Sequence, residues 1–157
     1  MNIRKTKTSL ISLLFISVAL GSNNVAAHSD GVKRIKSNNS VSATIDKLEN
    51  ALSKKGMTIF KRVDHAAGGK RAGINIRPTE LLIFGNPKIG TKLMQCNQAA
   101  ALDLPQKALA YKDESGQVWL LYNDPAYMAA RHHVKGCEKV IKKFTGALAN
   151  FTKIATQ

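Results

Sequence analysis

Polar residues that could bind or transform a ligand follow two apolar runs of this sequence. Asp64 and His65 end one run, and a carboxylate beside an imidazole can supply acid–base chemistry. Asp124 and Tyr127 follow another run, and His132 comes shortly after them. The ends of strands hold side chains rigidly and leave them exposed, so these residues are candidates for a ligand site. The enzyme alternative uses His65 and Asp124 as acid and base, although Asp124 can also serve as a helix cap.

The segment 85–92 resembles a phosphate-binding loop without matching it. A P-loop has Gly-Lys followed by Ser or Thr, whereas here Gly90 is followed by Thr91 and then Lys92. Backbone N–H groups at a helix start, beside Asn86 and two lysines, can still bind a small anion. A tight strand-to-helix turn is the structural alternative, and it requires no ligand.

Two methionines and several histidines are candidate metal ligands. Met128 and His132 are one helical turn apart, and with Met94 and His65 they could hold copper or haem. The sequence has no Cys-x-x-Cys-His, which excludes covalent haem. His28 would become the amino terminus after the cleavage described next, where its amine and imidazole can chelate copper. No cofactor is assigned from these residues.

The first 27 residues have the organisation of a secretory signal peptide. Three basic residues precede an apolar run at residues 10–20, and small residues occupy positions 25–27. The apolar run is much shorter than the roughly 20 residues of a spanning helix, which favours cleavage after Ala27 over a membrane anchor. We therefore expect a periplasmic or secreted protein whose mature chain has no membrane span.

The composition is strongly basic, with 24 Lys and Arg against 10 Asp and Glu. The expected cleavage removes three basic and no acidic residues, which leaves a formal net charge of +11. Such a field attracts polyanions, but export argues against nucleic acid as a partner. The basic residues are also scattered, which is typical of an ordinary solvated surface.

Two cysteines, Cys96 and Cys137, lie in the expected mature chain. An even count in an oxidising compartment indicates a disulfide, while two buried thiols are the alternative. Neither cysteine has a second ligand at the spacing of a zinc site.

The apolar patterns predict helices and strands in one domain over residues 41–157, after a flexible leader at 28–40 that allows a short strand at 32–35. The remaining sequence-based expectations are helices over 41–52, 125–133 and 134–155, a helix from about 90 to before Pro105, strands over 57–65, 73–77 and 79–84, a loop at 66–69 and a hairpin over 109–122. The last helix is amphipathic and is expected to pack on a sheet rather than lie on a membrane.

Several segments resemble a bacterial and archaeal family known as domain of unknown function 302. The matching segments are 64–68, 77–87, 90–91, 93–95, 102–105, 118–119, 122–127 and 131–132. The resemblance covers residues 42–133 and implies an α+β two-layer sandwich of an antiparallel sheet and helices, like a single copy of the TATA-binding-protein-like fold. It also implies a homodimer but no activity, and the two cysteines are not part of the pattern.

The sequence thus favours an exported homodimer that binds a small anionic or metal-containing ligand, with an enzyme and a purely structural domain as alternatives. The residues expected near the ligand are Asp64, His65, Asn86, Gly90, Thr91, Asp124, Tyr127 and His132.

Overall fold

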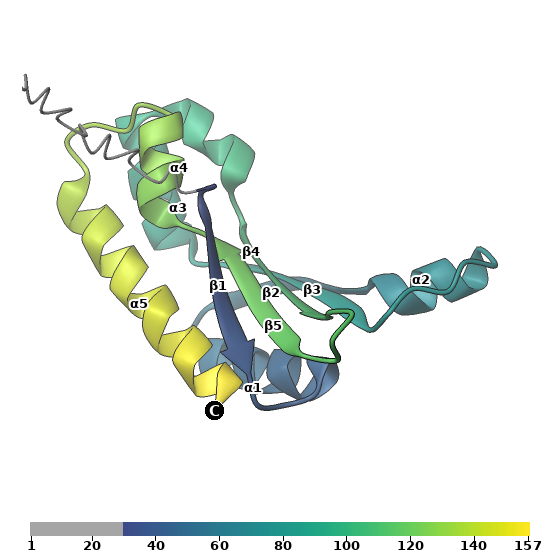
Figure 1. Cartoon of the computed structure of the whole chain (residues 1–157). Coiled ribbons are helices and arrows are strands. Elements are labelled where there is room, and N and C mark those ends of the chain that lie inside the picture. The colour runs from purple at the N-terminus through teal and green to yellow at the C-terminus, as the bar shows by residue number, and fades with distance from the viewer. Residues whose placement is uncertain (1–29) are drawn as a thin grey trace, which may run out of the picture.

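Five antiparallel strands form one sheet, in the order β1-β5-β4-β3-β2 (Figure 1). The strands are β1 (Val32–Ser37), β2 (Thr58–Asp64), β3 (Thr79–Gly85), β4 (Gln106–Lys112) and β5 (Val118–Asn123). The computed structural model describes residues 30–157, so the expected signal peptide and His28 lie outside the described residues. The α+β architecture with an antiparallel sheet confirms the expected fold class.

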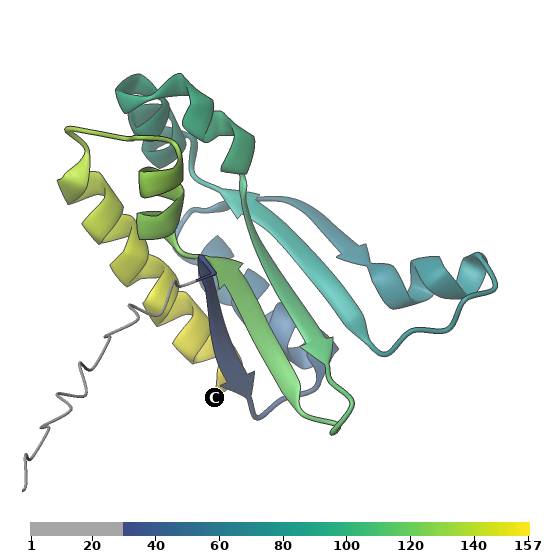
Figure 2. The same ribbon diagram turned by 45° about the horizontal axis from the view of Figure 1, so that its top comes forward.

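Two long helices, α1 (Val41–Ser53) and α5 (Glu138–Thr156), cover one face of the sheet and pack against each other (Figures 1 and 2). Ser40 begins α1, since its side chain accepts a hydrogen bond from the Ala43 N–H at 3.2 Å. The apolar stripes of both helices are buried, including Leu48 of α1 and Leu148 of α5. Within residues 30–157, no helix combines the length and apolarity needed to cross a membrane.

Three of the short helices are capped by an Asp or Asn that ends a strand or directly follows one. These helices are α2 (His65–Arg71), α3 (Pro87–Cys96) and α4 (Pro125–Arg131), and the 3₁₀ helix η1 (Gln98–Asp103) follows α3. Asp64, Asn86 and Asp124 each accept a hydrogen bond from a backbone N–H of the first turn, at 2.8–3.0 Å. Proline is the first residue of α3 and of α4, where its missing N–H is not needed.

Some sequence-based boundaries were wrong. The short strand allowed at residues 32–35 of the leader is present and extends to residue 37, because residues 32–37 pair with β5 along their whole length. Residues 66–69 are helical rather than a loop, since Asp64 caps α2. Residues 73–77 form no strand and are exposed. The last helix begins at Glu138 rather than at residue 134, after a turn in which His133 and Gly136 have positive φ angles.

The second face of the sheet carries an apolar patch as well, bordered by Arg34, Lys36, Lys61 and Lys107, and no described helix packs in front of it in Figure 2. One row runs across four strands, from Leu121 through Leu109 and Leu81 to Val63. Tyr111 and Trp119 are paired in a neighbouring row, and Ile83 lies on the same face. We call these seven half-buried residues the open face. An antiparallel sheet with one solvated face usually alternates apolar and polar residues, so this second apolar face is unusual.

Asp113 organises the turn between β4 and β5. Its carboxylate accepts hydrogen bonds from the Gln117 N–H at 2.9 Å, the Ser115 hydroxyl at 2.7 Å and the Trp119 indole N–H at 2.7 Å. The hydrogen bonds from Ser115 and Trp119 lower the pKa of Asp113 below its usual value of 3.8. The folded state therefore favours the charged carboxylate.

We expect Asp113→Asn to lower the free energy of unfolding at pH 7, because one carboxylate oxygen becomes an NH2 group, which cannot accept the hydrogen bond from Trp119 while the remaining oxygen accepts from Ser115 and Gln117. A carboxylate whose pKa is lowered on folding stabilises the fold above its unfolded pKa. That stabilisation is lost as the pH falls through the folded value. The difference between wild type and variant should therefore shrink below a pH of about 3.8. Urea unfolding followed by the fluorescence of Trp119, the single tryptophan, measures this. The neighbouring Glu114→Gln is the control, and an equal loss in both variants would contradict the assignment.

Candidate ligand-binding site

The sheet register places the expected site residues at two opposite ends of the molecule. Asn86 follows the end of β3 and Asp124 follows the end of β5, beside the start of β4. Asp64 pairs with Glu80 at the other end of the sheet. The structure therefore does not bring Asp64 and His65 together with Asn86 and Asp124. His65 and Asp124 do not form one acid–base pair for the same reason.

His65 begins a projecting segment, residues 65–78, that we call the arm and that consists of α2 and the loop after it (Figure 1). Asp64 lies directly before the arm. His65 is exposed, and no residue of α2 is buried. Asp64 is used by the backbone as the cap of α2. The geometry of this end gives neither residue a ligand cavity.

Asp124 and Tyr127, which follow β5, make side-chain contacts with β1 and with the residue before it. Asp124 caps α4 and forms an ion pair with Lys33 at 2.9 Å, which raises the pKa of the Lys33 ammonium group. The Tyr127 ring covers Gly31, where an added Cβ would lie only 2.3 Å from the ring. Gly31 also has a φ angle of +74°, which favours glycine. Both side chains therefore have structural contacts here.

Four of the expected residues, Asn86, Gly90, Thr91 and Met94, line one cavity of about 290 Å³, which we call the α3 cavity. It lies between α3, η1, the adjoining ends of β2, β3 and β4, and helix α5. The complete lining is Met57, Phe60, Gly85, Asn86, Pro87, Ile89, Gly90, Thr91, Leu93, Met94, Ala101, Leu104, Pro105, Gln106 and Phe144. Sequence analysis missed the residues contributed by β2, η1 and α5, because they are distant in the chain.

The lining of the α3 cavity is mainly apolar, and none of the lining residues carries a charge. Its two amides are already hydrogen-bonded: Asn86 accepts from the Lys88 N–H, and Gln106 donates to the Asn123 carbonyl at 2.8 Å. The N–H groups of Ile89 and Gly90 donate to the Asn86 carbonyl. The first turn of α3 thus has partners for the N–H groups that the sequence analysis assigned to an anion.

His132 is buried outside this lining and contacts Asp103. The distance from His132 Nε2 to Asp103 Oδ2 is 2.6 Å, and Arg131 approaches the same carboxylate at 3.4 Å. These contacts tie α4 to η1, which supplies part of the cavity wall. Sequence analysis did not select Asp103, although it lies in one of the segments that resemble the family.

The candidate metal ligands are dispersed among different surroundings. Met94 lines the cavity, Met128 is buried in the core, and His132 is paired with Asp103. Among residues 30–157, no group of three or more His, Cys, Asp or Glu side chains is placed to hold a metal. His28 belongs to the part of the chain that is not described.

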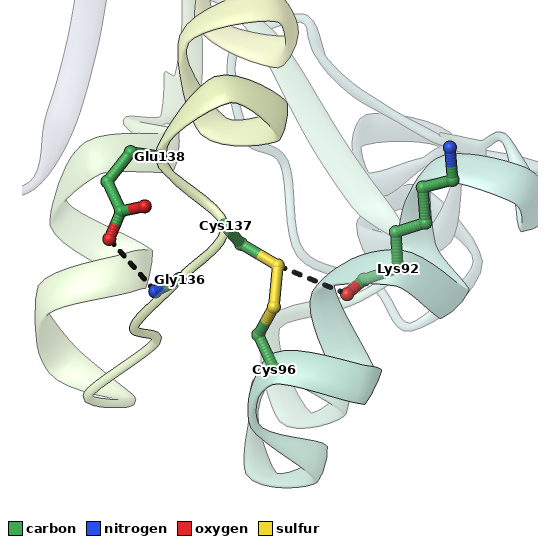
Figure 3. Close-up of a disulfide and its surroundings, with 5 residues drawn as sticks. All are labelled: Lys92, Cys96, Gly136, Cys137 and Glu138. Atoms are coloured by element: carbon green, nitrogen blue, oxygen red, sulfur yellow. Dashed lines mark hydrogen bonds between the residues drawn. A yellow bond between two sulfur atoms is a disulfide. The ribbon is translucent and has the colours of Figure 1, made fainter.

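Cys96 and Cys137 form the expected disulfide, with their Cα atoms 6.3 Å apart and a sequence separation of 41 (Figure 3). It joins the last residue of α3 to the residue before α5. Cys137 Sγ also lies 3.4 Å from the Lys92 carbonyl oxygen, which is a close contact because a disulfide sulfur has no proton to donate. The bond holds the α3 wall of the cavity against the helix that supplies Phe144.

Comparisons with known proteins identify the family, and a solved structure shares the fold. The model of the family "Domain of unknown function DUF302" matches residues 33–151. A solved structure, an uncharacterized conserved DUF302 protein from Bacillus stearothermophilus, has a TM-score of 0.72. It is 16% identical and covers 81% of this chain and 99% of its own. At that identity the likeness establishes the fold alone.

Three similar proteins come from Brucella suis, Brucella abortus and Brucella melitensis, and each is named a fluoride-specific ion channel, FluC 1 or FluC 2. Each is 45% identical over 126 residues, which cover 80% of this chain. The match covers 50% of the Brucella suis protein and 47% of the other two. This chain therefore spans about half the length of the curated relatives it matches.

Replacing Cys96 or Cys137 by Ser should lower the free energy of unfolding by about 3 to 4 kcal/mol, because opening a long loop raises the entropy of the unfolded chain. Urea unfolding with Trp119 fluorescence measures the loss. A reducing agent should bring the wild type to the stability of the variants and leave the variants unchanged. Equal stability of oxidised wild type and either variant would contradict the structural role of the bond.

Proposed function

The chain belongs to the DUF302 family, a domain of unknown function, and from its own geometry we propose that it binds a small, mainly apolar ligand. The α3 cavity is the single observation that carries this proposal. Side chains that are far apart in the sequence, from Met57 to Phe144, surround an apolar space there.

The size of the cavity suits a small organic molecule. Its 290 Å³ compares with about 150 Å³ for an apolar cavity that binds benzene, and with the lower limit of about 300 Å³ for ligand pockets. Met57 and Met94 are adaptable side chains that can adjust to the outline of a ligand. A molecule of about two aromatic rings would therefore fit.

The other expected ligand chemistries and the enzyme alternative have weaker support. A bare anion would find no charged side chain in the cavity lining. A metal would need ligands that are dispersed among the cavity, the core and an ion pair. An enzyme that used His65 and Asp124 would need the two ends of the sheet to meet. We do not extend to this chain the channel activity named for the Brucella proteins, because it spans only about half their length.

We propose in addition that the protein acts as a homodimer through the open face and the arm. Ile74 and Ile76 of the arm are 62% and 48% exposed, although the arm is held in shape by a hydrogen bond from the Ile74 N–H to the Gly69 carbonyl. A two-fold dimer can cover both unpartnered surfaces at once, because each copy contributes an arm and a face. Large exposed apolar patches commonly mark such interfaces. If the protein is a purely structural domain, dimerisation through this surface would be its main function.

Export to the periplasm or beyond the cell is also part of this proposal. The signal-peptide pattern of residues 1–27 supports it, and so does the Cys96–Cys137 disulfide, since disulfides persist in oxidising compartments.

The ligand proposal can be tested with 2-naphthol, a neutral two-ring fluorescent probe. We expect the wild type to bind it and Gly90→Leu to weaken binding about tenfold or more, because the new side chain occupies the cavity. Gly146→Leu is the matched control, since Gly146 is an exposed helical glycine of α5 with no atoms near an added Cβ. No binding by the wild type, or equal binding by both variants, would refute the proposal. Thermal unfolding verifies that both variants fold.

The dimer proposal predicts that wild type has about twice the monomer mass in light scattering after size exclusion. The double variant Leu109→Lys with Leu121→Lys should be monomeric, because charges within an apolar interface must lose their hydration. Leu102→Lys is the control, since Leu102 lies on η1 and is 73% exposed. A monomeric wild type at all accessible concentrations would reject the dimer. Retained far-ultraviolet circular dichroism shows that the double variant is folded.

A further inference from the structure

A cationic strip borders the mouth of the α3 cavity. Lys88 and Lys92 are exposed and one turn apart on α3. They line a shallow depression together with Pro87, Thr91 and Gln95. Pro87 and Thr91 also line the α3 cavity, so the depression borders the cavity. An apolar space and two positive charges thus lie side by side on one helix.

The two lysines have no acidic partner within the described residues. The ion pairs of that part of the chain use Lys33, Arg62, Arg77, Arg131 and His132. The acidic residue next to the cavity wall, Asp103, is occupied by His132 and Arg131. Lys88 and Lys92 therefore present uncompensated charge beside an uncharged cavity.

We infer that the ligand is an amphipathic anion, with its apolar tail in the α3 cavity and its acidic head at Lys88 and Lys92. This inference rests on the proposed function, because it assigns a chemical class to the ligand of the same cavity. The tail supplies most of the affinity through burial of apolar surface. The exposed lysines supply a smaller, salt-sensitive preference for negative charge. They take the role that backbone N–H groups of α3 cannot have, since those groups are hydrogen-bonded within the helix turn.

Three probes with the same tail and different heads test the head-group preference: octanoate, octanol and octylammonium. Calorimetric titration of the oxidised full domain at low salt should give the tightest binding for octanoate and the weakest for octylammonium. Raising the salt concentration should weaken octanoate and leave octanol unchanged, because screening acts on the charge alone.

The double variant Lys88→Gln with Lys92→Gln should weaken octanoate about three- to tenfold and change octanol less than about twofold, as expected for exposed charges. The matched control is Lys112→Gln with Lys153→Gln, which removes two exposed positive charges from the end of β4 and from the last turns of α5, outside the arm and the open face. At an ionic strength of about 0.1 M the control should leave the affinity for octanoate within about twofold of wild type, since the Debye length is then about 10 Å and charges away from the cavity are screened.

The outcomes separate the two proposals. If octanol binds in the α3 cavity and octanoate binds no tighter than octanol, the inference fails and the proposed function stands. If neither octanol nor octanoate binds, the inference fails, and the binding of 2-naphthol decides whether the proposed function stands. A short-chain monomeric phosphatidylglycerol, dihexanoyl phosphatidylglycerol, distinguishes the source of the acid. Tighter binding than octanoate indicates a lipid head group, and weaker binding indicates a free carboxylic acid. Either result supports an amphipathic anion if the double variant of Lys88 and Lys92 weakens the binding of the tighter probe.

Discussion

The antiparallel register of the five strands is the constraint on which the rest of this structure depends. Successive side chains alternate between the two faces, so one row of Leu82, Ala108 and Tyr122 supports the helices α1 and α5 while the next row forms the open face. The small side chains of Ala108 and Ala110 lie on β4, where α1 packs on the sheet. The same register decides which strand ends meet, and thereby which polar residues can be neighbours. A slip of one residue would exchange the two faces completely.

Helix capping uses the polar residues that follow the strands. A strand that leads directly into a helix leaves first-turn N–H groups without acceptors, and Asp64, Asn86 and Asp124 satisfy them. A ligand site built from the same residues would need their oxygen atoms to be available. The sequence pattern of an acid or amide after an apolar run is therefore ambiguous between a cap and a site. Here the α3 cavity is bounded by Asn86 but derives its chemistry from apolar neighbours.

Local signals allowed much of the fold to be predicted, whereas the cavity depended on distant contacts. The helical period of α1, the apolar run of β3 and the turn residues between β4 and β5 are each contained in a few neighbouring residues, and those elements formed as expected. Glycines at 68 and 69 indicated a loop, but the Asp64 cap and the following turn made this segment helical. The sequence marked Asn86, Gly90, Thr91 and Met94. It could not place Phe144 or Phe60 beside them, because tertiary packing alone joins these segments.

The positive charge of the molecule comes from its excess of basic residues, and the contacts of its few acidic residues decide where that charge is exposed. All 10 acidic residues lie in the described part of the chain, and each makes an intramolecular hydrogen bond or ion pair. Asp46, Glu49 and Glu80 all surround the single Arg62, so three negative charges offset only one positive charge at that place. Most lysines among residues 30–157 face solvent without an acidic partner. A surface that concentrates its anions in internal contacts attracts external anions over its whole area. The α3 cavity adds an apolar space beside two of these lysines. That combination would favour an acidic molecule with an apolar tail over an acidic molecule without one.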